Sequence, residues 1–243
     1  MSFEDKVVVV LGATGIIGSG VVRSYLDTKA TVVGVSRSGK RLDTLREQMS
    51  IRDDEPFLSV VGDFNDAFAA NASHNRVTEL LGGRPIDHVV SVIGSVSIGR
   101  APTSTTLESF RGAMEDGVFN SFSAAKVFLP RMLRRPGSSY TLTSGGLAHG
   151  MAEPSLWLGS MKNAAVNALT MALAVETRSY DVRVNTLCIH FSVARAGERT
   201  NNLGVPAVAD TFALAPAYLG MARGTTKGRV ICLASTGDVA QCI

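Results

Sequence analysis

The stretch KVVVVLGATGIIGSG, residues 6–20, joins a buried strand to a helix through a glycine-rich turn. Its run of valines predicts a strand that is covered on both faces. Gly12, Gly15 and Gly18 follow with the spacing G-x-x-G-x-x-G. Glycines in such a turn let the backbone approach a pyrophosphate, which the N-terminus of the next helix attracts. The spacing alone is a weak signal, because a turn of this kind can be mere geometry. Its place after the first strand favours nucleotide binding.

The same alternation of strand and helix continues to the end of the chain. Strands are expected at 6–12, 31–36, 57–63, 87–94, 138–145, 181–189 and 228–235. Helices are expected at about 15–29, 42–49, 64–81, 105–133 and 155–179. Strands buried on both faces and separated by helices predict an α/β fold, a Rossmann-like doubly wound parallel sheet with helices on both faces. We expect one domain over residues 1–243, with a substrate lid at about 190–218.

Composition and charge exclude several classes of function. The chain is 45% hydrophobic and 19% charged, with a formal net charge of +3, so no nucleic-acid partner is expected. The start MSFEDK does not fit a signal peptide, and no apolar run is long enough to span a membrane. We therefore predict a cytoplasmic protein. Cys188, Cys232 and Cys242 lack a metal-like spacing, so we interpret them as free thiols and expect no metal site.

The end of the second predicted strand indicates which nucleotide is bound. An NAD enzyme usually has an acidic residue there, which holds the 2′-hydroxyl of the ribose. This chain has Ser36 and Arg37, with Lys40 and Arg41 close behind. A hydroxyl beside a guanidinium suits a 2′-phosphate, so we predict NADP(H). The alternative is that these cations form a solvated, basic first turn of a helix.

These features together resemble the short-chain dehydrogenase/reductase family over nearly the whole chain. Besides the glycine turn, the segments VVGDFND, VFLPRM, ALAVE and VRVN are similar to family motifs. The resemblance implies that Asp63 bonds the adenine amino group, and it implies a homodimer or homotetramer. It also implies a set of cofactor-binding residues: Gly12, Thr14, Gly15, Ile17, Gly18, Ser36, Arg37, Asp63, Phe64, Ile93, Gly94 and Lys162.

The catalytic positions depart from the family pattern. The family has a serine after the fifth strand, then a tyrosine, and a lysine four residues beyond the tyrosine. That lysine clamps the nicotinamide ribose and lowers the pKa of the tyrosine, which moves the substrate's proton. Lys162 fits the lysine, but Leu158 stands at the tyrosine position. Gly117 stands where the family has an asparagine in its fourth helix.

Lys162, Ser144 and His190 are the candidate catalytic residues. Ser144 is one place from the aligned serine and either contacts substrate or caps the next turn. His190 replaces a glycine beside the expected nicotinamide, where it either donates a hydrogen bond or simply packs. His149 and Glu153 lie in a loop expected to wall the substrate pocket, although loop side chains are usually solvated.

Without the phenol, hydride transfer suits an acceptor that needs no proton from an enzyme side chain. The first hypothesis is an NADP(H)-dependent oxidoreductase that reduces an activated C=N or C=C (or carbonyl) group of a small organic substrate. The alternative is a non-redox protein of the same fold, either a cyclase or isomerase or a cofactor-sensing regulator. A third reading is a vestigial glycine turn that binds nothing. Lys162 argues against it, because a buried lysine without a partner or ligand costs stability.

Overall fold

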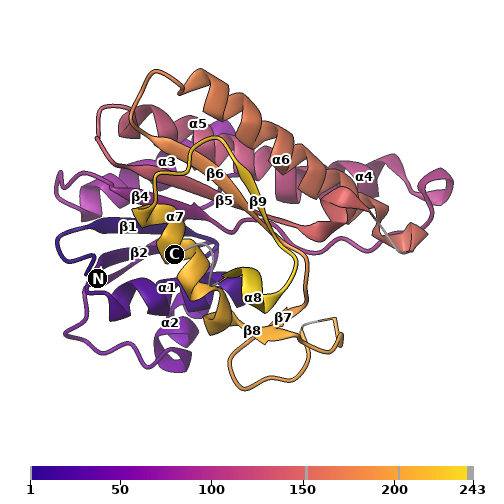
Figure 1. Ribbon diagram of the computed structural model, residues 1–243, viewed down its shortest axis with the longest axis horizontal. Coiled ribbons are helices and arrows are strands. Elements are labelled where there is room, and N and C mark those ends of the chain that lie inside the picture. The colour runs from indigo at the N-terminus through magenta and orange to yellow at the C-terminus, as the bar shows by residue number, and fades with distance from the viewer. Residues whose placement is uncertain (1, 151–152, 202, 240–243) are drawn as a thin grey trace.

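The computed structural model of the protein describes residues 2–150, 153–201 and 203–239. Its main sheet has seven parallel strands in the order β3-β2-β1-β4-β5-β6-β9. The order reverses between β1 and β4, and helices cover both faces of the sheet (Figure 1), which confirms the predicted doubly wound α/β fold. The strands are β1 (Val7–Leu11), β2 (Thr31–Ser36), β3 (Phe57–Val61), β4 (His88–Ser91), β5 (Ser139–Gly145), β6 (Arg183–Ile189) and β9 (Val230–Leu233).

The helices bury two separate apolar clusters, one on each face of the sheet. They are α1 (Ile16–Asp27), α2 (Gly39–Gln48), α3 (Ala67–Leu80), α4 (Leu107–Met114), α5 (Asn120–Met132), α6 (Trp157–Glu176), α7 (Ala215–Arg223) and α8 (Thr236–Val239). Val8 and Val10 of β1 pack with α1, α2 and α7, whereas Val7 and Val9 pack with α3, α5 and α6. Alternate residues of one strand thus serve opposite faces, which is why the strand reads as a continuous apolar run.

The prediction that every strand is buried on both faces is wrong for β3 and β9. These are the two edge strands of the sheet, and each has partly or fully exposed residues. Helices cover the centre of a twisted sheet more completely than its margins. The expected strand at 87–94 is also shorter, since β4 ends at Ser91.

Two further segments differ from the sequence prediction. The expected helix at 105–133 is interrupted by a π-helical turn, η2 (Glu115–Phe119), between α4 and α5. Such wide turns often mark functional positions in helices. The expected lid contains a short parallel pair, β7 (Val193–Ala194) and β8 (Ala209–Asp210), followed by the 3₁₀ turn η5 (Thr211–Leu214). No helix in the part of the chain that the structure describes is long and apolar enough to cross a membrane.

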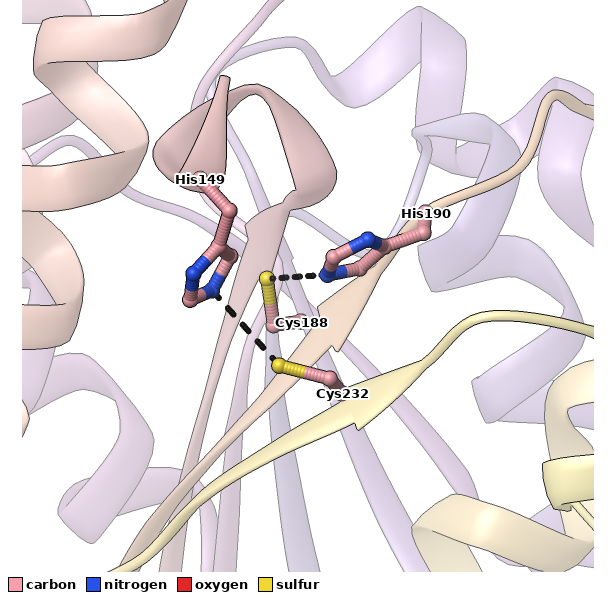
Figure 2. A group of neighbouring side chains, drawn as sticks. All are labelled: His149, Cys188, His190 and Cys232. Carbon is pink, nitrogen blue, oxygen red and sulfur yellow. Dashed lines mark hydrogen bonds between the residues drawn. The ribbon is translucent and has the colours of Figure 1, made fainter.

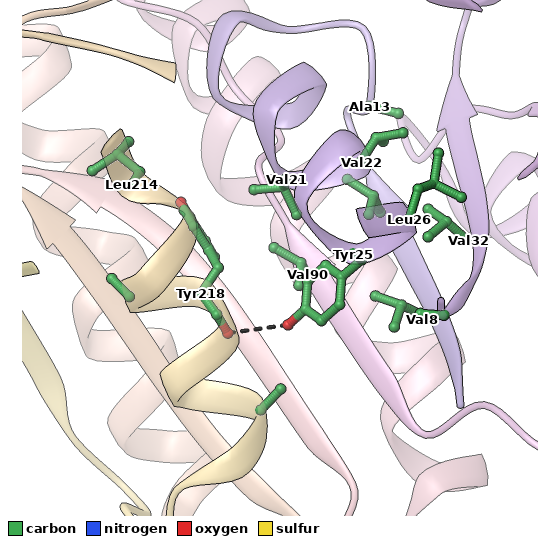
Figure 3. Packing of buried hydrophobic residues seen from close by; sticks show 14 of the residues in the cluster. Val8, Ala13, Val21, Val22, Tyr25, Leu26, Val32, Val90, Leu214 and Tyr218 are labelled. Atoms are coloured by element: carbon green, nitrogen blue, oxygen red, sulfur yellow. Dashed lines mark hydrogen bonds between the residues drawn. The ribbon is translucent and has the colours of Figure 1, made fainter. Parts of the chain in front are cut away.

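A buried pair of tyrosines joins α1 to α7 (Figure 3). The Tyr25 hydroxyl donates to the Tyr218 carbonyl oxygen at 3.0 Å, and the Tyr218 hydroxyl lies 2.8 Å from Thr143 Oγ1 in β5. Burial raises the pKa of both phenols, so they stay neutral. The two bonds link α1 to α7 and α7 to β5 through the core.

Replacement of Tyr25 by phenylalanine tests this tie. Tyr25→Phe removes the hydroxyl but keeps the ring, so the free energy of unfolding should fall by about 1 kcal/mol, the net worth of a buried hydrogen bond. Urea unfolding followed by circular dichroism measures the change. Tyr180→Phe, at a tyrosine that is 44% exposed, is the matched control and should be neutral. Equal changes in the free energy of unfolding for the two variants would contradict a stabilising role of the Tyr25 hydroxyl.

Candidate functional site

The turn from β1 into α1 can be built only with glycine at two positions. Gly12 has φ +82°, and a Cβ there would lie 2.6 Å from the Val92 carbonyl oxygen. A Cβ at Gly18 would lie 2.2 Å from the Gly12 carbonyl oxygen. Gly15, the N-cap of α1, supplies no side-chain cap to the first amide groups of the helix. This backbone cradle with uncapped N–H groups fits the pyrophosphate of a dinucleotide.

Cationic and hydroxyl side chains surround the same turn. Thr14 Oγ1 lies 2.9 Å from Ser36 Oγ at the end of β2. Arg41 and Arg195 each donate to the Thr14 carbonyl oxygen at 3.1 Å, and Arg37 is exposed beside Ser36. Sequence reasoning missed Arg195, because the segment that carries it lies far away along the chain. The guanidinium groups make this edge suitable for phosphate.

The other predicted cofactor residues follow β3 and β4 at the same edge of the sheet. Asp63 is partly buried, and its Oδ1 accepts the Phe64 N–H at 2.7 Å. Phe64 is buried against Phe128 of α5, with 6.2 Å between ring centroids. Ile93 is partly buried, and Gly94 has φ +122°. The carboxyl ends of β1 to β4 therefore bring the predicted residues to one side of the molecule.

Lys162 of α6 is buried, and its amine has two partners. Nζ donates to the Ser95 carbonyl oxygen at 2.6 Å and lies 3.4 Å from Asp116 Oδ2. Oδ2 also accepts the N–H and the hydroxyl of Ser95, at 2.9 and 2.7 Å. The expectation that this lysine lacks a partner without a nucleotide is therefore wrong, because Asp116 in the π-helical turn supplies a charge that the sequence reading overlooked.

Burial and charge act in opposite directions on this pair. Burial lowers the pKa of Lys162, and the charge of Asp116 opposes that shift. Burial alone would raise the pKa of Asp116. The hydrogen bonds from Ser95 and the charge of Lys162 outweigh burial, so the pKa of Asp116 falls below its usual value. Asp116 is therefore an ionised carboxylate at neutral pH and no proton donor.

Two residues that the sequence analysis singled out, Gly117 and Leu158, shape the space around Lys162. A Cβ at Gly117 would lie 2.9 Å from Lys162 Cδ, so the glycine makes room for the lysine stem. Leu158, one helical turn before Lys162, is 3% exposed. Leu158 and Asp116 border a pocket of about 760 Å³, whose other walls are the loop after β4 and α4. Together they form a candidate substrate pocket next to the lysine.

The structure places the two remaining catalytic candidates in a different environment. Ser144 is buried, and its hydroxyl donates to Asn167 Oδ1 of α6 at 2.6 Å. His190 Nε2 lies 3.5 Å from Cys188 Sγ, and its ring stacks on His149 with 5.3 Å between centroids. Neither Ser144 nor His190 is among the described residues that border the pocket. Glu153 is exposed.

Substitution of Asp116 tests the buried ion pair. Asp116→Asn should lower the free energy of unfolding at pH 7 by about 1–2 kcal/mol, since Lys162 loses its counter-charge while staying buried. A carboxylate with a lowered folded-state pKa stabilises the fold above its unfolded pKa of about 3.9 and loses that effect as the pH falls through the folded value.

The difference between wild type and Asp116→Asn should therefore stay constant from pH 7 to about 5 and shrink as the pH falls through about 4 and below. Urea unfolding across that range measures it. Asp43→Asn, at an exposed carboxylate of α2, is the control and should show little effect at any pH. A difference that does not depend on pH would contradict the proposed charge pairing.

Comparison with known proteins agrees with the fold. The sequence profile of the short chain dehydrogenase family matches residues 6–201. The chain is 27% identical to the short-chain dehydrogenase/reductase iacG of Pestalotiopsis fici over 241 residues, covering 96% of this chain and 93% of that protein. It is 30% identical to L-fucose dehydrogenase of Oryctolagus cuniculus over 193 residues, covering 76% of this chain but only 62% of that enzyme.

Solved structures show the same architecture at lower identity. A dehydrogenase/reductase from Sinorhizobium meliloti 1021 superposes with a TM-score of 0.83 at 17% identity, covering 97% of this chain and 96% of that one. A short-chain oxidoreductase from Pseudomonas aeruginosa PAO1, described as containing an atypical catalytic center, gives a TM-score of 0.82 at 23% identity and covers 98% of both chains. With the profile match over most of its length, the chain belongs to the short chain dehydrogenase family.

Proposed function

We propose that this protein is an NADP(H)-dependent oxidoreductase of a small organic substrate. The observation that carries the proposal is the end of β2, where Ser36 pairs with Thr14 and Arg41 reaches the same turn. A hydroxyl and cations in place of a carboxylate favour a 2′-phosphate over a free 2′-hydroxyl. The relative named for L-fucose supports a substrate of low molecular mass.

Each part of the nucleotide has candidate partners at the carboxyl edge of the sheet. The Gly12 to Gly18 cradle would hold the pyrophosphate, Ser36 and Arg37 the 2′-phosphate, and Asp63 the adenine. Lys162 would bind the nicotinamide ribose, because Asp116 favours the charged form of its amine close to the pocket. Bound NADPH would supply a hydride to a carbon held in that pocket.

The groups around the pocket favour an acceptor that needs no acid from the protein. Leu158 has no proton to donate and Asp116 is ionised. Ser144 lies outside the pocket, and its hydroxyl is engaged by Asn167. A lost general acid costs about 10²- to 10⁴-fold in rate. We therefore propose reduction of an activated C=N or C=C bond rather than of a simple ketone. The lack of a general acid among these described residues also favours the second candidate, a non-redox protein that keeps the nucleotide as a structural element.

The assembly that we propose is a single-domain chain acting in the cytoplasm as a homodimer or homotetramer. Large apolar side chains are exposed along the outer helices that would pair. Phe122 of α5 is 48% exposed, and Met171 and Val175 of α6 are 61% and 66% exposed. Burial of such side chains against a second copy would remove them from water.

Calorimetric titration with both nucleotides tests the cofactor proposal. We expect micromolar affinity for NADPH and much weaker binding of NADH. Arg37→Ala should weaken NADPH binding roughly 10- to 100-fold, as loss of one charged contact to a phosphate predicts, and should leave NADH unaffected. Lys162→Ala should weaken both nucleotides. Arg52→Ala, at an exposed arginine paired with Asp54, is the control. Equal affinity for both nucleotides would contradict the preference for NADP(H).

Installing a phenol beside Lys162 tests the proposed chemistry. Leu158→Tyr should raise NADPH-dependent reduction of a simple ketone by about 10²- to 10⁴-fold relative to Leu158→Phe, which adds a ring of similar size without the hydroxyl. Absorbance of NADPH records the rate. The wild type should instead consume NADPH with iminium or doubly activated alkene substrates. Tight NADPH binding without turnover on any of these would favour the non-redox alternative. Equal ketone rates in the two Leu158 variants would contradict the role assigned to this position.

A further inference from the structure

Four metal-ligating side chains converge beside the ends of β5, β6 and β9 (Figure 2). His149 ends the 3₁₀ turn η3 (Gly146–His149), Cys188 lies in β6, His190 follows β6, and Cys232 lies in β9. Their ligand atoms all lie within 4.8 Å of one another. His190 Nε2 is 3.5 Å from Cys188 Sγ, and His149 Nε2 is 3.5 Å from Cys232 Sγ. Two sulfur and two nitrogen atoms thus face a common centre.

The topology of the sheet explains this convergence. Cys188 and Cys232 are register partners on neighbouring parallel strands. His190 stands two residues beyond Cys188, so its side chain leaves the chain on the same side. His149 comes from the turn after β5, the other neighbour of β6. At Gly146 a Cβ would lie 2.7 Å from the ring of His190, so glycine leaves the space that this imidazole occupies.

The spacing of the ligand atoms fits a tetrahedral zinc ion. Zinc lies about 2.3 Å from a thiolate sulfur and about 2.0–2.1 Å from an imidazole nitrogen, which places sulfur and nitrogen about 3.5 Å apart in a tetrahedron. Both sulfur–nitrogen contacts are 3.5 Å, and no two of the four ligand atoms lie more than 4.8 Å apart. Two cysteines with two histidines suit zinc better than the oxygen-preferring ions.

From this geometry we infer that His149, Cys188, His190 and Cys232 bind one Zn²⁺ as a structural site. On binding, both thiols lose their protons to solvent, so two thiolates balance the charge of the ion. Four protein ligands complete the coordination shell and leave no position for substrate. The ion would link the η3 turn to β6 and β9. His190 would then be a metal ligand and not a catalytic residue. The inference does not depend on nucleotide binding.

The expectation of no metal site rested on spacing along the chain. Metal motifs that can be recognised in a sequence place at least two ligands close together in a known pattern. Here the only near pair is Cys188 and His190, while His149 and Cys232 come from segments about 40 residues away on either side. The pairing of β6 with β9 brings Cys188 and Cys232 together. The sequence does not predict which residues of these two strands are register partners.

Metal analysis of the untagged, reduced full-length protein tests the site. Protein produced with zinc in the medium should retain about one zinc per chain after dialysis. Replacement of the bound zinc by Co²⁺ should give the intense visible absorption of a tetrahedral, thiolate-bound cobalt ion. Cys232→Ser and His149→Ala should each weaken zinc binding roughly 100-fold or more in competition with a chromophoric chelator, because each removes one of four ligands. Cys242→Ser, at the cysteine outside the described residues, should keep full zinc content.

Three outcomes would overturn the inference. The first is wild-type protein that takes up neither zinc nor cobalt under reducing conditions, a result that does not rely on any variant folding. The second is zinc affinity that is unchanged in Cys232→Ser. The third is a Cys188–Cys232 disulfide found by peptide mass analysis in place of the metal, which would make the pair a redox couple. Nucleotide affinity is measured separately, so failure of this site leaves the proposed cofactor binding untouched.

Discussion

The parallel arrangement of seven strands is the constraint on which the other features depend. Because all strands run in one direction, their carboxyl ends share one edge, and the segments that follow them meet there. The glycine cradle follows β1, the cationic end of β2 lies beside it, and the loop after β4 reaches Lys162. The candidate metal ligands follow β5 and occupy β6 and β9 at the same edge.

The buried amine of Lys162 shows how the fold accommodates a charge inside an apolar helix. A lysine inside an apolar helix needs a counter-charge, and Asp116 with the Ser95 carbonyl provides it. Gly117 leaves room for the stem of the lysine, and the π-helical turn holds Asp116 toward it. The lysine is therefore stable whether or not a nucleotide is bound. Its amine pairs with Asp116, which borders the same pocket as Leu158.

Local sequence patterns predict the fold, but they do not predict the contacts between residues of the candidate site. Valine-rich runs and the glycine spacing predicted the strand at 6–12, observed as Val7–Leu11, and the helix that follows it. The roles of Asp116, Arg195 and the cysteine–histidine cluster depend on contacts between distant segments. Strand register and the π-helical turn create those contacts, and neither leaves a periodic signal in the sequence. The assignment of Cys242 as a free thiol lies outside the described residues.

A crystal structure of the protein grown with NADPH tests the central claim most directly. The account predicts the pyrophosphate on the Gly12 to Gly18 cradle, the 2′-phosphate against Ser36 and Arg37, and the hydroxyls of the nicotinamide ribose within hydrogen-bonding distance of Lys162 Nζ. The nicotinamide ring would then face the pocket bordered by Leu158. A complex in which the nucleotide lies elsewhere, or in which its 2′-phosphate contacts neither Ser36 nor Arg37, would contradict the account.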